Sequence, residues 1–543
     1  MHTRPSGTTA KLVVAALFSL TLGGGIGLAV GSFEDESFLF FLAGTAVALT
    51  LIFAADRFGI ASLKGYSVGE VGLVSLFFIL LAVWIHFWQS MHKYEYPKTF
   101  SDMECWARTT GQVASLFIAL LSLPTARSSV WSMIFGVSWE AGVRFHRVLG
   151  YGALVASIMH QVLWWKVYAA NSDDACAGQL PKWPRDIFAI PLCFHADDWV
   201  VPAMFFVWVF MLIGMGIFAH EYFRRNHFEL FYYTHHIYMV IYVAVLIQAP
   251  SLWYYLIGGL SLWMLDRVIR FQRGCRQVQI KELKALPGAI THLKVSYSGK
   301  AGISYAPGQY CFLNIPEISS LQWHPFSISS APCDGSSTLD FHIKNMGEDT
   351  FTGTLQTLAR NSNSMETSLS VDGPYGTPIE FARYQRIVFV AGGIGITPAH
   401  SNFRHIVKQA LTPDAGVSVP EVHLSWIFQN QECFLGVPAV SETLHEIAEL
   451  NSVSMPMEYE EFPATFSLVA TREEGQDSTA CGLPLVCMSS RDINFIEEIS
   501  SKSPLGAEAR TLVFACGPKS LLEGVSDAAM ALGYDFHAET FEL

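Results

Sequence analysis

Two histidines stand fourteen residues apart in the stretch FHRVLGYGALVASIMH, residues 145–160, which is otherwise mostly apolar. Fourteen residues advance an α-helix by about 21 Å and turn it nearly four times, so His146 and His160 share one face at two depths. An ionisable residue inside an apolar run of bilayer length is costly and marks a candidate functional site. Neutral imidazole is a good ligand for iron. The spacing therefore predicts two stacked hemes, each with an axial imidazole at its own depth.

A second run, LFYYTHHIYMVIYVAVLIQ, offers partners for these imidazoles. His235 and His236 lie at the depth expected for His146, which predicts an inner site with two histidine ligands. The partner of His160 should lie some thirteen residues beyond His235, where the chain carries Gln248. Glutamine is a poor heme ligand, so the outer site lacks its second axial ligand, the fourth of the two hemes together.

Three further histidines bear on this interpretation. His86, in the third apolar run, could supply the missing ligand from another helix, although no spacing rule supports it. His220 and His227 fall in a loop and are expected at the surface. The alternative to iron ligation is that the paired histidines are ordinary buried polar residues, satisfied by hydrogen bonds.

The histidines lie in the more apolar half of the chain. Of 543 residues, 51% are hydrophobic and 15% are charged, whereas soluble proteins carry about 25% charged residues. Eight apolar runs come near the roughly 20 residues that cross a bilayer. They cover 11–31, 37–55, 70–90, 108–124, 146–168, 198–219, 230–248 and 252–268. The first run follows Arg4 and ends in small residues, so a cleaved signal peptide is the alternative to a retained helix.

Basic residues orient these runs, because Lys and Arg collect in cytosolic loops. If the eight runs alternate, one side receives Arg127, Arg144, Arg147, Arg224, Arg225, Arg267, Arg270, Arg273 and Arg276, and we assign it to the cytosol. The opposite side receives 169–197, where Cys176 and Cys193 either form a disulfide or stay as two thiols.

The charge balance and the composition divide the chain. Its net charge of −13 argues against nucleic acid as a partner. The apolar half predicts a lipid bilayer as its surroundings. After about residue 272 the composition is that of a soluble protein, and the polar segment 451–480 is expected to be a loop.

Two motifs open the soluble half, PGQY (307–310) and HPFSISS (324–330). Apolar and polar residues alternate around both, which predicts strands of a small β-barrel. A serine hydroxyl and backbone amides on these strands could hold an isoalloxazine ring and its pyrophosphate. Composition alone leaves an ordinary β-strand as the alternative for HPFSISS.

The segment IVFVAGGIGITP (387–398) follows, an apolar strand that runs into Gly392, Gly393 and Gly395 and then Pro398. Glycines at a strand-to-helix turn let a phosphate backbone approach closely. Proline suits the first turn of a helix, whose free N–H groups and dipole favour an anion. The segment therefore predicts a nucleotide site.

A second strand, LVFACGPKSL (512–521), ends in Cys516-Gly517-Pro518. An open α/β sheet binds its ligand at the carboxyl ends of parallel strands. Cys516 would face a nicotinamide ring there or be a buried structural thiol. Phe541 would stack on a flavin ring or fray.

Taken in order, these residues resemble the ferric reductase and NADPH oxidase superfamily over about residues 70–543. The resemblance implies a multi-domain membrane protein: an α-helical transmembrane heme bundle followed by a cytosolic ferredoxin reductase-type module, made of a β-barrel FAD domain and an α/β nucleotide-binding domain. It implies N-terminal transmembrane helices at 1–69, the heme domain at 70–272, the FAD domain at 273–382 and the NAD(P)H domain at 383–543.

The resemblance also carries the family's site residues to matching positions. His146 and His235, with His236 beside it, would ligate the inner heme b, and His160 would ligate the outer one. FAD would be held by His324, Pro325, Phe326, Ser327, Gly347 and Thr350. The nucleotide would be held by Gly392, Gly393, Gly395, Thr397, Pro398, Gly517 and Pro518. Cys516, beside the nicotinamide, and Phe541, over the flavin, would be the catalytic residues.

Four positions depart from the family pattern. Gln248 replaces the fourth heme ligand. Trp164 stands one turn after His160, where superoxide-producing oxidases tend to carry another histidine, and this favours metal reduction. Gln429 and Leu483 stand where the oxidases carry arginine near the nucleotide. Arginine recognises a 2′-phosphate through paired donors, so the preference for NADPH over NADH is weakened.

The resemblance implies a transmembrane oxidoreductase. Electrons would pass from cytosolic NADPH, or NADH, through FAD and heme to a ferric or cupric chelate across the membrane, with the plasma membrane as the family default. One alternative is a superoxide-generating NADPH oxidase, whose acceptor is dioxygen. The other is a degenerate single-heme scaffold or partner subunit, which Gln248 favours and the flavin and nucleotide motifs oppose.

Overall fold

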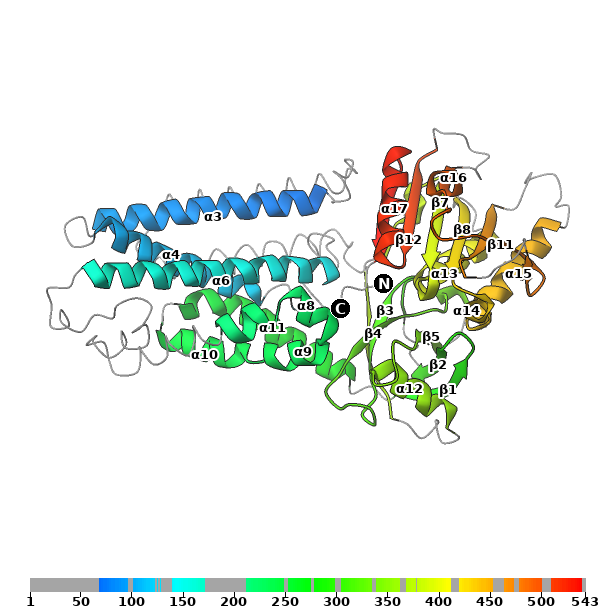
Figure 1. Cartoon of the computed structure of the whole chain (residues 1–543), viewed down its shortest axis with the longest axis horizontal. Coiled ribbons are helices and arrows are strands. Elements are labelled where there is room, and N and C mark those ends of the chain that lie inside the picture. Colours follow the sequence, from blue (N-terminus) through cyan, green and yellow to red (C-terminus); the bar gives the residue numbers. More distant parts are fainter. Residues whose placement is uncertain are drawn as a thin grey trace, which may run out of the picture. The chain divides into compact units, whose positions relative to one another are not determined.

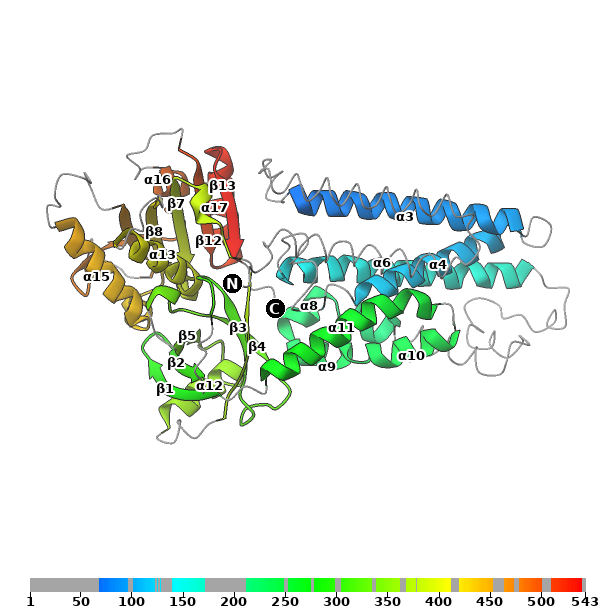
Figure 2. The same cartoon turned by 180° about the vertical axis from the view of Figure 1, so that it is seen from behind.

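The structure is a computed structural model, shown from two sides in Figures 1 and 2. It describes residues 68–95, 101–122, 125, 127, 139–170, 211–248, 252–274, 278–297, 304–334, 338–361, 368–376, 378–411, 419–452, 463–472, 478–500 and 509–539. The chain divides into two compact units, and the boundary falls between Arg267 and Val268. The first unit is helical, and the second combines strands with helices.

Helices make up the described part of the first unit. They are α3 (Val68–Glu95), α4 (Asp102–Leu121), α6 (Trp139–Ala170), a π-helix (Met211–Ile217), α8 (Glu221–Asn226), α9 (Phe228–His235), α10 (Tyr238–Gln248) and α11 (Leu252–Gly274), which crosses the boundary. Ser101 caps α4, because its hydroxyl accepts a hydrogen bond from the Glu104 amide at 3.2 Å. Phe117 of α4 and Ala153 of α6 share the apolar core of this unit.

Four of the expected apolar runs correspond to α3, α4, α6 and α11. The runs 11–31 and 37–55, most of the run 198–219, and both Cys176 and Cys193 lie outside the described residues. Within the described ranges, no helix combines the length and the apolar character that crossing a bilayer demands.

The run 230–248 is two helices, so the expectation of a single helix is wrong. After His235 the backbone tightens, since the amides of His236 and Ile237 bond to carbonyls three residues back, at 3.3 and 3.1 Å. The Thr234 hydroxyl donates to the carbonyl four residues back at 2.6 Å. Such side-chain bonds compete with the helical ladder and bend a helix.

The strands expected around PGQY and HPFSISS are present as neighbours in one antiparallel sheet, and a second antiparallel sheet belongs to the same unit. The sheets have the orders β1-β2-β5 and β4-β3-β6. Their elements are β1 (Val278–Leu286), β2 (Ile290–Tyr297), β3 (Tyr310–Asn314), β4 (His324–Ser327), β5 (Thr338–Lys344) and β6 (Ser370–Tyr375), with the helix α12 (Phe351–Arg360) between β5 and β6. Leu293, Leu313, Phe341 and Leu355 come from both sheets and from α12, and they form one buried core.

A buried ion pair joins the last turn of α11 to this part of the second unit. Nε of Arg270 donates to Oδ2 of Asp372 at 3.1 Å, and the Tyr375 hydroxyl donates to Oδ1 at 2.6 Å. The Asp372 side chain is 3% exposed. Because removal of one partner from a buried pair is strongly destabilising, this contact fixes the last turn of α11 against β6.

A seven-stranded sheet completes the second unit, in the order β10-β11-β9-β8-β7-β12-β13. Its strands are β7 (Arg386–Gly392), β8 (Glu421–Phe428), β9 (Ala464–Ala470), β10 (Ser478–Ala480), β11 (Leu483–Cys487), β12 (Thr511–Cys516) and β13 (Asp535–Glu539). All neighbours pair in parallel except β10 with β11. The sheet therefore has the architecture expected of a nucleotide-binding domain.

Helices cover both faces of this sheet. One apolar core contains residues of α13 (Ile396–Leu411), α14 (Gln431–Leu435) and α15 (Pro438–Ser452). The other contains residues of α16 (Phe495–Ser500) and α17 (Lys519–Ala531). A sheet covered on both faces needs near-continuous apolar strands, and every residue of β7 and β12 is buried.

The segment 451–480 is not simply a loop, and that expectation is wrong. It contains β9, which pairs with β8 on one side and with β11 on the other. Ala464, Leu468 and Ala470 of β9 are at most 1% exposed. Small and polar residues between them hide the apolar pattern by which a buried strand is recognised.

Candidate functional site

Both histidines of α6 are held by α4. Nδ1 of His146 lies 2.9 Å from the Leu121 carbonyl oxygen, and Nδ1 of His160 lies 2.7 Å from that of Ala107. Ala107 and Leu121 are themselves fourteen residues apart, so the two helices match each other's spacing. Because a carbonyl oxygen can only accept, each ring carries its proton on Nδ1 and leaves Nε2 bare. That tautomer and that backbone contact are what a metal-ligating imidazole requires.

Gly111 gives the ring of His160 its room. A Cβ added at this glycine of α4 would lie 2.6 Å from Cε1 of that ring. On another side, the ring meets Trp164 edge-on with 6.3 Å between centroids, and the Arg108 guanidinium lies over Trp164 at 5.3 Å. The backbone carbonyl, the glycine and the indole together fix the orientation of this imidazole.

The structure brings the inner pair of histidines together. The rings of His146 and His235 have centroids 6.0 Å apart and planes inclined by 76°. An ion between two imidazoles, with bonds of about 2.0 Å, needs ring centres roughly 6 Å apart. Nδ1 of His235 is buried and has no hydrogen-bond partner among the described residues. These two residues therefore fit a heme iron as axial ligands.

The other candidate ligands lie differently. His236 is exposed, and its Nδ1 is 2.7 Å from the Tyr232 carbonyl oxygen, so the structure favours His235 as the ligand. His86 is exposed on α3. Gln248 is the last residue of α10, beyond the break that follows His235. A count of thirteen residues along one continuous helix therefore does not describe where it lies.

The HPFSISS motif packs on the beginning of α12 and pairs with the strand that follows PGQY. The rings of His324 and Phe326 pack on Phe351, with 4.3 and 6.3 Å between centroids. Ser327 is the last residue of β4, and it pairs with Tyr310, the last residue of PGQY. Pro325 pairs with a residue of β3 in the same ladder. A serine hydroxyl and two strand edges are thus assembled in one place.

Gly347 and Thr350 build the turn that begins α12. The Thr350 hydroxyl accepts from the Gly353 amide at 3.2 Å and donates to the Gly347 carbonyl at 2.7 Å. Gly347 has φ +144°, a conformation that favours glycine. The remaining free amides and the helix dipole favour an anion at this end. The turn, in the sequence GEDT (347–350), could hold a diphosphate such as that of FAD.

The glycine turn and the CGP segment pack backbone against backbone. A Cβ added at Gly517 would lie 3.0 Å from the Cα of Gly392. A Cβ added at Gly395 would lie 2.7 Å from the carbonyl carbon of Cys516. The indole of Trp426 donates to the Gly393 carbonyl at 2.9 Å and holds the turn. The carboxyl ends of β7 and β12 therefore form one edge at which a nucleotide backbone can approach.

The first turn of α13 follows directly. Thr397 and Pro398 are buried there, and the Thr397 hydroxyl donates to the Ile394 carbonyl at 3.1 Å. Proline at this position leaves no amide unsatisfied. Pro518 is exposed and begins α17 as its cap residue. Two helix beginnings therefore lie at the nucleotide edge.

Cys516 is 1% exposed, and burial raises the pKa of its thiol. The thiol therefore stays protonated at neutral pH, so it can offer contact and polarisability but not a thiolate. Phe541, the second expected catalytic residue, lies outside the described residues.

Gln429 and Leu483, which stand where the oxidases carry arginine, lie at opposite edges of the sheet. Leu483 is 3% exposed and begins β11, so it belongs to the core at the edge opposite the glycine turn. Gln429 directly follows β8, and its carbonyl accepts from the Arg472 amide at 2.9 Å. Only Gln429 stands near the carboxyl edge of the sheet.

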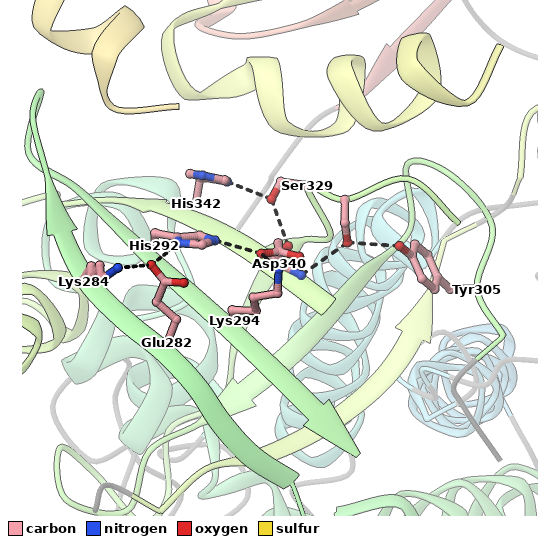
Figure 3. A network of polar contacts seen from close by, with 9 residues as sticks. Glu282, Lys284, His292, Lys294, Tyr305, Ser329, Asp340 and His342 are labelled. Atoms are coloured by element: carbon pink, nitrogen blue, oxygen red, sulfur yellow. Dashed lines mark hydrogen bonds and ion pairs between the residues drawn. The ribbon is translucent and has the colours of Figure 1, made fainter. Parts of the chain in front are cut away.

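A polar network that sequence reasoning missed joins Ser329 of HPFSISS to residues of β2 and β5 (Figure 3). His292 stacks on His342 with 4.7 Å between centroids, and its Nε2 lies 2.9 Å from Oδ1 of Asp340. The Ser329 hydroxyl donates to the Asp340 carbonyl at 2.9 Å, so Nδ1 of His342, at 2.8 Å, must donate to Ser329. These residues come from β2, from β5 and from the chain after β4, and only the fold brings them together.

Protonation of His342 predicts a loss of stability in mild acid. Burial, followed by the charge of His292, lowers the pKa of His342 from 6.5 to about 3. Below pH 6.5 the unfolded chain binds a proton that the folded chain refuses, so the free energy of unfolding falls by up to about 1.4 kcal/mol per pH unit. Thermal melting between pH 7 and pH 5 should show a falling midpoint that His342→Asn flattens. Equal slopes for the two proteins would contradict this assignment.

Three family models match the chain. The family described as ferric reductase like transmembrane component matches residues 110–246, the FAD-binding domain matches 275–379, and the ferric reductase NAD binding domain matches 384–462. The first match covers both histidines of α6 and both of the THH segment. The second covers HPFSISS and GEDT, and the third covers the glycine turn.

Curated relatives include both reductases and oxidases. Ferric reduction oxidase 4 of Arabidopsis thaliana is 27% identical over 369 residues, which are 66% of this chain and 49% of that protein. A superoxide-generating NADPH oxidase heavy chain of Dictyostelium discoideum is 23% identical over 425 residues, 70% of this chain and 60% of that one. The chain thus spans about half the length of the curated relatives it matches.

Solved structures match about half of this chain. The flavohem-like FAD/NAD binding domain of nitric oxide dioxygenase from Vibrio cholerae O1 biovar El Tor is 17% identical, with a TM-score of 0.35. The match covers 50% of this chain and 99% of that one.

Proposed function

Because the chain belongs to the ferric reductase and NADPH oxidase superfamily, we propose that it carries electrons across a membrane, from NAD(P)H through FAD and heme to a ferric or cupric chelate. We assign residues 70–272 to the heme domain, 273–382 to the FAD domain and 383–543 to the NAD(P)H domain. Residues 1–69 would add further membrane helices.

One observation carries the proposal. Both α6 histidines point Nδ1 at carbonyls of α4 that are spaced as the histidines are, so both present Nε2 in the same way. A flavin reductase without heme would have no use for two imidazoles prepared at two depths. His146 completes its site with His235, and His160 is prepared identically.

The chain's own residues prepare the electron path. Gly392 and Gly395 let the glycine turn pack closely on the CGP segment, and the open space at Gly393 would admit the nucleotide backbone. The beginning of α12 would hold the FAD diphosphate. Ser327, at the end of β4, would place a hydroxyl beside the flavin ring. When bound, FAD would supply two-electron hydride acceptance and heme iron would supply one-electron transfer. The protein sets distances, axial ligands and polarity along the way.

The outer faces of the helices support a lipid environment. Val148, Val155 and Met159 of α6 are 50–60% exposed, and Val240 and Val243 of α10 are 52% and 59% exposed. Apolar side chains repeat on these exposed faces at helical spacing. Contiguous exposed apolar surface of this kind marks contact with a membrane or with another protein.

Trp164 supports a metal chelate rather than dioxygen as the acceptor. It fills the space one turn beyond His160, with its ring against the imidazole. In the superoxide-producing oxidases that this chain resembles, another histidine tends to stand there. An indole in its place removes a proton donor from the outer end of the path.

The experiment that tests the proposal starts from the protein purified in detergent, with heme and FAD quantified per chain. NADPH added without oxygen should reduce FAD and then heme, and ferric citrate should reoxidise both. Superoxide formed in proportion to NADPH consumed would favour the oxidase alternative instead. Heme without NADPH-driven reduction would favour the scaffold alternative and overturn the proposal.

The same preparation also gives the number of hemes per chain, which tests whether the outer site is occupied. Two hemes per chain would mean that His160 finds a partner other than a histidine thirteen residues beyond His235. One heme would mean that the outer imidazole is prepared but not used, and the electron path would then be shorter.

A further inference from the structure

One hydroxyl links α13 to both flavin-binding segments of the second unit. Ser401 is 0% exposed. Its Oγ donates to the Ser330 carbonyl at 2.8 Å and accepts from the Gly308 amide at 3.4 Å. Ser330 ends HPFSISS, and Gly308 lies in PGQY. The hydroxyl therefore donates to one flavin-binding segment and accepts from the other.

The PGQY and HPFSISS segments are themselves held in place where they contact Ser401. The Ser330 hydroxyl bonds to the Tyr305 hydroxyl at 3.0 Å and accepts from the Asp340 amide at 3.3 Å. Its neighbour Ser329 is held by the network of Figure 3. Gly308 has φ +77°, and an added Cβ would collide with the Asn402 side chain. The backbone of PGQY thus packs directly on α13.

The same helix begins at the nucleotide turn. The glycine turn Gly393–Gly395 leads straight into α13, and Ser401 lies five residues after the first residue of that helix, Ile396. Over five residues a hydrogen-bonded helix moves almost as a rigid body, so a displacement at one end is passed to the other. A shift at Ser401 would therefore move the nucleotide turn relative to the flavin segment.

We propose that Ser401 is a positioning residue for hydride transfer, which sets how the nucleotide turn lies on the PGQY and HPFSISS segments. The inference rests on the proposed function. Hydride transfer needs the donor and acceptor carbons in near-attack contact, and a misplacement of about 1 Å can lower a rate by about 100-fold. Ser401 would act on the alignment of the reacting groups, not on the affinity for either of them.

The test compares Ser401→Ala with Ser425→Ala in the full-length protein loaded with FAD. Ser425 is also 0% exposed and lies in the same sheet domain, but its hydroxyl has no partner among the described residues. The measurement is the rate of anaerobic flavin reduction by NADPH in single turnover, together with the NADPH concentration at half-maximal rate and the FAD content.

Ser401→Ala should lower the limiting rate of flavin reduction about 10-fold or more, while the half-saturating NADPH concentration and the FAD content stay within about twofold of wild type. Ser425→Ala should match wild type in all three. Ser401→Cys, which keeps a polar group of similar size, should recover part of the rate.

A wild-type rate in Ser401→Ala would overturn the inference. So would loss of FAD from both Ser401 variants, because Ser401 would then serve folding and not alignment. Failure of the wild-type protein to reduce its flavin with NADPH would instead overturn the proposed function, and the two failures are thereby distinguished.

Discussion

Replacing His235 with alanine is expected to reduce bound heme to less than about a tenth of its wild-type amount, if one heme is present, and to abolish NADPH-driven heme reduction. His146 would keep its contact with the Leu121 carbonyl but lose the ring 6.0 Å away. Loss of even a hydrogen-bond partner of a metal ligand costs metal sites about 10- to 100-fold in affinity, and His235 would itself be a ligand. Reduced-minus-oxidised absorbance spectra of the purified protein measure the effect.

The adjacent histidine supplies the matched control. His236 is exposed and directs Nδ1 to the Tyr232 carbonyl in the preceding helix α9, so His236→Ala should keep its heme. Imidazole added to the buffer should restore part of the heme absorbance of His235→Ala, because it can enter the space of the missing ring. Equal heme in wild type and His235→Ala would show that this pair does not hold the iron.

The second large effect is expected from Gly395→Ala. An added Cβ would lie 2.7 Å from the carbonyl carbon of Cys516 and closer still to its oxygen, and a strand backbone cannot move aside cheaply. Overpacking of this kind costs about 1–3 kcal/mol. We expect NADPH-driven flavin reduction to fall about 10- to 100-fold, while dithionite still reduces the heme. Stopped-flow absorbance at the flavin band measures the rate.

Gly533→Asn is the control for this substitution. Gly533 has φ +71°, with open space around the position of a Cβ, and it lies in the turn after α17. Asparagine tolerates that conformation better than most residues, so flavin reduction should be unchanged. If Gly395→Ala reduced its flavin at the wild-type rate, close backbone approach at this turn would not be needed for nucleotide binding.

Features set by neighbouring residues along the chain could be predicted from sequence. The helix that carries His146 and His160 follows from a mostly apolar run that contains no proline. The strand, turn and helix around Gly392 follow from glycine and proline chemistry that acts within a few residues. The end of β12 before Gly517 and Pro518 follows for the same reason. Each of these predictions needs only local geometry.

Features set by contacts across the fold could not be predicted. No proline or glycine marks the break after His235, which depends on side chains bonding back to their own helix. The strand β9 is buried because β8 and β11 flank it, and its own residues do not reveal this. Ser401 and His342 look like unremarkable polar residues until the fold brings β5, HPFSISS and α13 together.

The burial of Cys516 has a consequence for how the protein ages in use. Peroxide oxidises a thiolate much faster than a thiol. The raised pKa of Cys516 keeps it protonated, and its side chain is 1% exposed. Any dioxygen that captured stray electrons would generate oxidants beside a thiol that is poorly reactive toward them. Among the thiols of the described ranges, oxidation would fall first on those of Cys333 and Cys481, which are exposed, and Cys516 at the nucleotide edge would stay reduced longer.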